Sequence, residues 1–130
     1  MPSQLTDHAR RLLDDKSFVT LATLEADGSP QQTVVWAARD GDNVLISTIE
    51  GRRKHQNLAR DPRASVMINP PDKPYTYVEI RGKASMTTEG GRELINKLAH
   101  KYIGKDYDMD TPDAVRVVIR ISPEKVIDRG

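Results

Sequence analysis

Residues 17–39, SFVTLATLEADGSPQQTVVWAAR, contain the pattern that decides the fold. Residues 17–24 are apolar or β-branched on both faces, which predicts a strand that is covered on both sides. The DGSP segment at 27–30 predicts a turn, and residues 31–39 predict the returning strand. A second short turn leads into another apolar run at 43–49. Two consecutive hairpins indicate an antiparallel meander.

The rest of the chain adds helices and further strands. Apolar residues at helical or alternating spacing predict helices at 4–15 and 89–103, and strands at 63–69, from Thr76 onward and at 115–121. A short basic helix is expected at about 51–60, ended by Asp61 and Pro62. Six strands joined mostly by hairpins, without alternation of strands and helices, indicate an antiparallel barrel. We therefore predict a mainly β fold with flanking helices, in a single domain that spans residues 1–130.

The composition excludes several classes of function. The chain has no cysteine, so disulfides, thiolate metal sites and a cysteine nucleophile are excluded. The histidines His8, His55 and His100 lack ligand-like spacing, and no serine lies in a nucleophile motif. We therefore expect no metal and no catalytic side chain. No apolar run is long enough to span a membrane, and the N-terminus has no apolar signal segment, so we expect a cytoplasmic protein without a membrane partner.

The segment GRRKHQNL at 51–58 places three cations, Arg52, Arg53 and Lys54, where a helix begins. A helix N-terminus is already partly positive, so cations there are unfavourable by a few tenths of a kcal/mol unless an anion lies among them. Unpaired N–H groups together with these cations form a good phosphate site. The turn is therefore either simply solvated or binds the phosphate of a ligand.

The positive charge is concentrated in one place. Five of the 20 Lys and Arg residues lie in 51–63 with only one of the 19 acidic residues, which leaves this segment at +4 and the remainder at −3. Nucleic-acid-binding proteins are usually basic over a broad face and present exposed aromatic residues, which are scarce here. We therefore expect a small anionic ligand and no nucleic acid. Because the side chains supply no reactive group, an enzyme of this sequence needs a cofactor, and many redox cofactors carry a phosphate.

Residues 17–36 and 44–68 resemble the FMN-binding split-barrel group that includes pyridoxamine 5'-phosphate oxidase. The most specific part is R-x-K-x-x-N-L-x-R-D-P-R-A at 52–64, and the pattern is most similar to the small deazaflavin (coenzyme F420)-dependent reductases of that group. The resemblance implies a six-stranded split barrel that forms a homodimer with a cofactor groove at each end of the interface. It also implies an oxidoreductase that transfers a hydride from reduced F420 to an electron-poor double bond of a small planar organic acceptor.

The resemblance further implies which residues bind the cofactor. Arg52 and Lys54 would pair with its phosphate, and Arg53 lies beside them, with a solvent-facing position as the alternative for Arg53. Asn57 would orient the loop or bind the cofactor.

Six other residues have implied contacts with the rest of the cofactor. Ser47 and Thr48 would offer hydroxyl or backbone contacts near the ribityl chain, and Val35 and Trp36 belong to the strand that would lie along the ring. Trp36 has the alternative role of dimer core. Two tyrosines would reach the cofactor from the other subunit or else cover the barrel mouth: Tyr75 and Tyr77.

Two alternatives to an F420-dependent enzyme remain open. One is an FMN-dependent oxidase or reductase of the same fold, since both cofactors present a phosphate and a similar ring. The other is a non-catalytic cofactor-binding protein. Oxidation of pyridoxamine phosphate is not expected, because the chain lacks the longer C-terminal region that holds the pyridoxal substrate in that enzyme.

Overall fold

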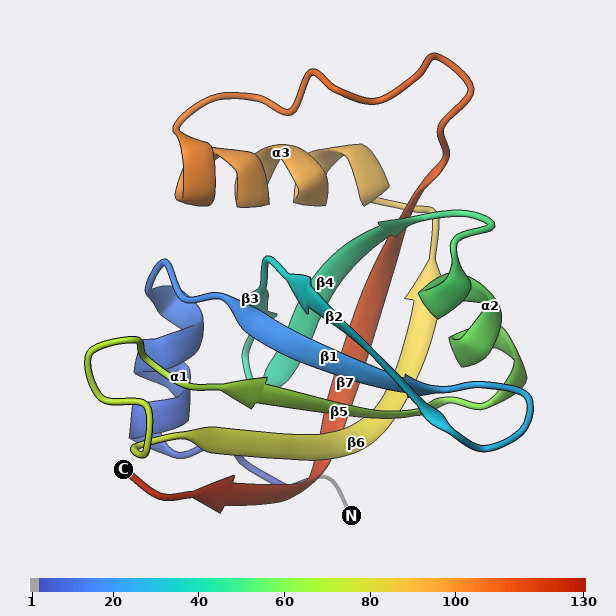
Figure 1. Cartoon of the computed structure of the whole chain (residues 1–130). Helices are drawn as coiled ribbons and strands as arrows, with labels where there is room; N and C mark the ends of the chain where they lie inside the picture. Colours follow the sequence, from blue (N-terminus) through green and yellow to red (C-terminus); the bar gives the residue numbers. More distant parts are fainter. Residues whose placement is uncertain (1–2) are drawn as a thin grey trace.

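The computed structural model describes residues 3–130, which form one antiparallel sheet and three helices (Figure 1). The seven strands of this part are β1 (Val19–Leu24), β2 (Pro30–Val35), β3 (Ala38–Asp40), β4 (Asn43–Ile49), β5 (Arg63–Ile68), β6 (Val78–Thr87) and β7 (Arg116–Asp128). The helices are α1 (Asp7–Asp14), α2 (Arg53–Arg60) and α3 (Gly91–Ile103). The predicted mainly β class is confirmed. Within residues 3–130, no helix is long and apolar enough to cross a membrane.

The two edges of the sheet come together near Trp36 and Ala37. The strand order is β2-β1-β5-β6-β7-β4-β3, so β2 and β3 lie at opposite edges. Only Trp36 and Ala37 separate these strands in the chain, and the sheet therefore has to curl until its edges meet there (Figure 1). The prediction of six strands was wrong by one, because the strand expected at 31–39 is interrupted at this point.

Side chains of α3 stabilise the interruption. The Ala37 N–H donates to the Tyr102 hydroxyl at 3.2 Å, and the Ala37 carbonyl accepts from Lys101 Nζ at 2.6 Å. The Tyr102 hydroxyl in turn donates to the Ser17 carbonyl. A buried backbone group without a partner costs about 1–3 kcal/mol, so the break depends on these contacts. Both partners lie more than 60 positions further along the chain, separated from Ala37 by 65 and 64 residues.

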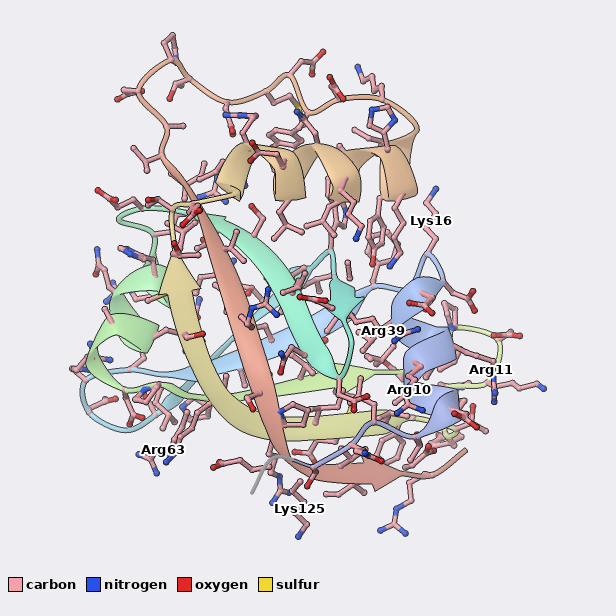
Figure 2. All side chains as sticks on the ribbon, turned by 180° about the vertical axis from the view of Figure 1, so that it is seen from behind. Arg10, Arg11, Lys16, Arg39, Arg63 and Lys125 are labelled. Atoms are coloured by element: carbon pink, nitrogen blue, oxygen red, sulfur yellow. The ribbon has the colours of Figure 1, made fainter. Side chains whose placement is uncertain are left out.

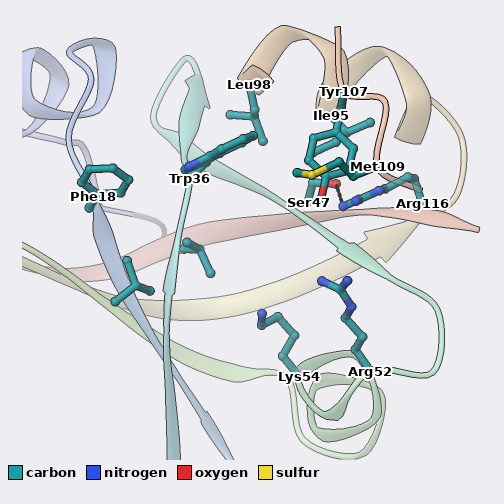
Figure 3. A pocket seen from close by; sticks show the side chains of 12 residues that line it. Phe18, Trp36, Ser47, Arg52, Lys54, Ile95, Leu98, Tyr107, Met109 and Arg116 are labelled. Carbon is teal, nitrogen blue, oxygen red and sulfur yellow. Dashed lines mark hydrogen bonds between the residues drawn. The ribbon is translucent and has the colours of Figure 1, made fainter. Parts of the chain in front are cut away.

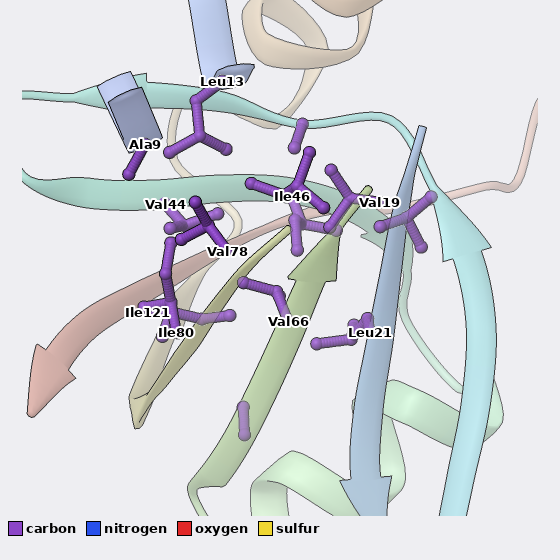
Figure 4. Packing of buried hydrophobic residues seen from close by; sticks show 14 of the residues in the cluster. Ala9, Leu13, Val19, Leu21, Val44, Ile46, Val66, Val78, Ile80 and Ile121 are labelled. Carbon is purple, nitrogen blue, oxygen red and sulfur yellow. The ribbon is translucent and has the colours of Figure 1, made fainter. Parts of the chain in front are cut away.

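The main hydrophobic core fills the inside of the curled sheet (Figure 4). Val19 and Leu21 are alternate residues of β1 and both face inward, where they are at most 1% exposed. Ile46 of β4 and Ile80 of β6 join them from other strands. Leu13 of α1 packs against the same cluster and closes one end of it.

Helix α1 is held against the hairpin formed by β3 and β4. It begins at Asp7 after the Thr6 cap, three residues later than predicted. Arg10 forms an ion pair with Asp42 at 3.0 Å, and Arg39 forms one with Asp14 at 2.8 Å (Figure 2). These ion pairs link the outer side of the helix to the edge of the sheet.

Helix α3 lies on the outer face of the sheet rather than inside it (Figure 1). Leu94 and Leu98 pack with Leu45 of β4 and Val118 of β7 in a second hydrophobic cluster. Trp36 packs against this cluster from the strand break. The core therefore has two layers, and the outer one borders the site described below.

We expect Tyr102→Phe to lower the free energy of unfolding by about 1–3 kcal/mol, because the Ala37 N–H would lose its partner in a buried position. Urea unfolding would measure the difference. The matched control is Tyr75→Phe, because the Tyr75 side chain is 87% exposed. A Tyr102→Phe variant as stable as the wild type would mean that the hydroxyl does not support the strand break.

Candidate functional site

A groove of ≈ 370 Å³ opens on the outside of the sheet beside the strand break. This volume falls within the range of small-molecule sites. Its walls come from β2, the start of α2, α3 and residues 104–115, which we call the strap (Figure 3). The lining residues are Phe18, Val34, Val35, Trp36, Ser47, Arg52, Lys54, Ile95, Leu98, Tyr107, Met109 and Arg116. Within residues 3–130, the lining therefore includes three cations and no acidic residue.

Trp36 forms the centre of the apolar wall. Its indole is stacked on the Tyr102 ring, with centroids 5.2 Å apart and 6° between the planes. Tyr107 of the strap meets the indole edge-on at 6.1 Å. Because rings from α3 and the strap both contact it, Trp36 is a rigid apolar surface that suits a flat ligand.

Arg52 and Lys54 form the cationic end of the groove. Arg52 is the N-cap residue of α2 and makes no side-chain cap bond, and the first turn contains no acidic residue. In the described part of the chain, no ion pair involves Arg52 or Lys54. Burial lowers the pKa of the Lys54 ammonium, and the neighbouring Arg52 charge lowers it further. A bound anion would reduce the repulsion between Arg52 and Lys54 and would accept hydrogen bonds from the N-terminus of α2.

A hydrogen-bond network fixes α2 in position. Asn57 is fully buried and donates to the Thr23 hydroxyl of β1 at 3.0 Å. Arg60 donates to Asn57 Oδ1 at 3.0 Å and to the Leu24 carbonyl at 2.6 Å. The network anchors the helix to β1, so the first turn and its cations keep their place at the groove.

The other end of the groove contains a buried arginine. Arg116 donates from Nε and Nη2 to Asp110 at 2.8 and 2.6 Å, and both side chains are under 10% exposed. The hydrogen bonds from Arg116 hold the pKa of the Asp110 carboxyl below its ordinary value, and Arg92 contributes a second ion pair at 3.0 Å. Arg116 also lies over the Tyr107 ring at 4.8 Å and reaches Ser47 Oγ at 3.3 Å.

The structure brings together half of the residues predicted for the site. Five of them line the groove: Val35, Trp36, Ser47, Arg52 and Lys54. Five do not line it: Thr48, Arg53, Asn57, Tyr75 and Tyr77. For these five residues, contact with a cofactor stays a prediction.

The reasons for these absences differ. The side chains of β4 alternate, so Ser47 faces the groove whereas Thr48 faces the core and is 0% exposed. Arg53 points away and pairs with Glu25 at 3.4 Å. Asn57 points toward β1 instead, where it donates to the Thr23 hydroxyl.

Tyr75 and Tyr77 lie just before β6, outside the groove. Tyr75 is exposed, and Tyr77 is partly buried. Their predicted contact with a cofactor in the other subunit stays a prediction.

Sequence reasoning missed the side of the groove that α3 and the strap supply. Ile95 and Leu98 belong to the helix predicted at 89–103, and their apolar spacing alone did not indicate that they line a groove. Tyr107 and Met109 lie in a segment without periodicity. Arg116 alternates in the sequence with Val115 and Val117. This alternation indicated that the Arg116 side chain lies on the other face of the strand from these valines, and it was the one available sign of its role.

The resemblance implied a split barrel with the cofactor phosphate at the start of the short basic helix, and the curled antiparallel sheet and cationic start of α2 are compatible with it. The chain belongs to the pyridoxamine 5'-phosphate oxidase family, whose model matches residues 5–130. The superfamily predicted from residues 17–36 and 44–68 is therefore confirmed.

Solved structures of other proteins are similar to this chain. An F420 reductase is 27% identical with a TM-score of 0.84, and the match covers 95% of this chain and 98% of that one. A conserved hypothetical protein from Mycobacterium tuberculosis is 24% identical with a TM-score of 0.77, covering 96% and 84%. A putative pyridoxamine 5'-phosphate oxidase from Listeria innocua is 21% identical with a TM-score of 0.75, covering 95% and 98%. The last two support the fold alone.

We expect Thr48→Val to leave ligand binding in the groove unchanged and to raise the free energy of unfolding by about 1 kcal/mol. The Thr48 hydroxyl is buried without a hydrogen-bond partner in the described structure, and valine has nearly the same shape without the polar atom. Urea unfolding and cofactor titration would measure the two effects. A loss of cofactor affinity in this variant would restore Thr48 to the binding site.

Proposed function

We propose that this protein is an oxidoreductase that uses reduced coenzyme F420 to reduce an electron-poor double bond of a small planar organic acceptor. The observation that carries the proposal is the charge of the groove, whose lining in the described structure contains three cations and no acidic residue. Two of these cations, Arg52 and Lys54, lie at the N-terminus of α2, where a phosphate is favoured. The similarity to an F420 reductase at 27% identity supports F420 over FMN.

The residues present fit a cofactor with a phosphate and a flat ring. Arg52 and Lys54 would pair with the phosphate, and the Ser47 hydroxyl would offer a hydrogen bond beside the apolar wall. Val35 and Trp36 would pack along the ring and exclude water from it. Reduced F420 supplies a hydride when it is bound. The protein's contribution is orientation and desolvation, and the proton that completes the reduction comes from solvent.

We propose that two copies of the chain form a homodimer through the outer face of β2, β1 and β5. Val34 and Met67 both pair in register with Thr20, so they flank it on the same face, where they are 70% and 37% exposed. Phe18 lies two residues before Thr20 and is 56% exposed. Exposed apolar side chains that gather on one face favour a protein interface. A partner on this face would also cover the groove, which Phe18 and Val34 line.

We expect Met67→Asp to weaken the dimer at least tenfold, because it would place an unpaired carboxylate in an apolar interface. Sedimentation velocity over a concentration series would measure the dissociation constant. The control is Val115→Asp, at a position that is 42% exposed and lies at the end of the strap, away from β1, β2 and β5 in the sequence. A wild-type chain that sediments as a monomer would contradict the proposal.

We expect Arg52→Ala and Lys54→Ala each to weaken F420 binding by about 1–3 kcal/mol, the range for hydrogen bonds to charged groups. Fluorescence titration with F420 and, in parallel, with FMN would measure the affinities. Arg53→Ala is the matched control, because Arg53 is the adjacent cation but pairs with Glu25 and does not line the groove.

The same titrations distinguish the alternatives. Tight binding of FMN without binding of F420 would make the protein an FMN-dependent member of the family. F420 binding without turnover of any quinone or enone would favour a cofactor-binding protein. Equal affinity of the wild type, Arg52→Ala and Lys54→Ala would place the phosphate elsewhere.

A further inference from the structure

We propose that the end of the groove around Arg116 is the acceptor subsite, and that it takes a planar molecule with a carboxylate or a similar anionic group. The inference rests on the proposed function, since it assigns the substrate class for the same groove. It comes from the third cation of the lining, which the phosphate of the cofactor does not require. Figure 3 shows Arg52 and Lys54 extending from α2 on one side of the groove, with Arg116 beside Ser47 and Met109 on the other.

The Arg116 guanidinium still has hydrogen-bond donors available. Its Nε and Nη2 are used by Asp110. Within residues 3–130, Nη1 has only the 3.3 Å contact with Ser47 Oγ, which is long for a charged donor. The side chain is fixed by the Asp110 carboxylate on one edge and by the Tyr107 ring at 4.8 Å. A donor held in this way loses little conformational freedom when an anion binds.

The local charge balance favours an anion. Asp110 is shared by two arginines, Arg92 and Arg116, so the group of three carries one net positive charge. Only Arg116 of the three lines the groove. A ligand in the groove therefore meets the guanidinium, whereas the carboxylate lies behind it.

The surrounding side chains favour a flat ligand. Trp36 and Tyr107 meet at 84° and form an aromatic corner next to the guanidinium. Met109 contributes a flexible apolar side chain that is 69% exposed, which can adjust to rings of different size. The strap supplies Tyr107 and Met109, and the Arg116–Asp110 ion pair ties the strap to β7.

The test compares two ligands of the same shape and different charge. Equilibrium dialysis would measure the binding of 2-naphthoate and of 2-naphthamide to the wild-type protein, both cofactor-free and saturated with F420. We expect the wild type to bind the carboxylate at least about tenfold more tightly than the amide, as expected for charge-assisted hydrogen bonds. We also expect naphthoate and F420 to bind together.

The variants identify the cation responsible. Arg116→Lys should reduce the preference for naphthoate to less than about threefold, because a lysine lacks the planar fork that reaches both Asp110 and a ligand. Arg120→Lys is the matched control on the same strand, because Arg120 pairs with Asp40 and does not line the groove, and it should keep the full preference. Arg52→Gln, tested in the cofactor-free protein, should also keep it.

Three results would overturn the proposal. One is equal binding of naphthoate and naphthamide by the wild-type protein, a result that does not depend on whether any variant folds. The second is a preference that is lost in Arg52→Gln but kept in Arg116→Lys. The third is displacement of F420 by naphthoate, which would assign this end of the groove to the cofactor. If F420 does not bind at all, the proposed function fails, but the cofactor-free dialysis still decides whether Arg116 recognises a planar anion.

Discussion

The arrangement of the molecule depends on the hydrogen bonds between the Ala37 backbone and two side chains of α3. Tyr102 accepts from the Ala37 N–H, and Lys101 donates to the Ala37 carbonyl. Because of these bonds, β2 can end and β3 can begin without leaving a buried backbone N–H or C=O unpaired. The two strands can therefore lie at opposite edges of one curled sheet. They also seat α3 on the outer face and leave Trp36 between helix and groove. The fold and the apolar wall of the site thus share one cause.

A second constraint acts at the N-terminus of α2, where the positive charges of Arg52 and Lys54 are held close together. The whole chain has a formal net charge of +1, yet the described lining of the groove contains three cations and no acid. Neighbouring cations at a helix N-terminus repel each other and the helix dipole. The Asn57 network holds this arrangement in place from behind. The folded chain therefore maintains an unfavourable charge distribution that an anionic ligand would convert into a favourable one.

The parts of the fold that local pattern determines could be predicted from the sequence, and those that depend on distant partners could not. The hairpin of 17–39 follows from its turn residues and strand pattern, and the end of α2 follows from Pro62. The break at Ala37, in contrast, depends on side chains more than 60 positions away. At Ser47 and Thr48 the sequence carried more than was used, because strict alternation along β4 already places the two side chains on opposite faces. The strap has no periodicity, so the positions of Tyr107 and Met109 could only come from the folded structure.

The buried Arg116–Asp110 pair is hard to explain by stability alone. Removing two charges from water costs several kcal/mol per ion, and an apolar pair of similar size is often as stable or more so. Both side chains are under 10% exposed, and the pair ties the strap to β7, with Arg92 of α3 joined to it through Asp110. An apolar contact would serve that purpose without the desolvation cost. What an apolar contact could not do is present a fixed guanidinium edge to the groove, with the charge of Asp110 shared between two arginines behind it. The arrangement is therefore better explained by recognition of an anionic group than by the folding of the strap.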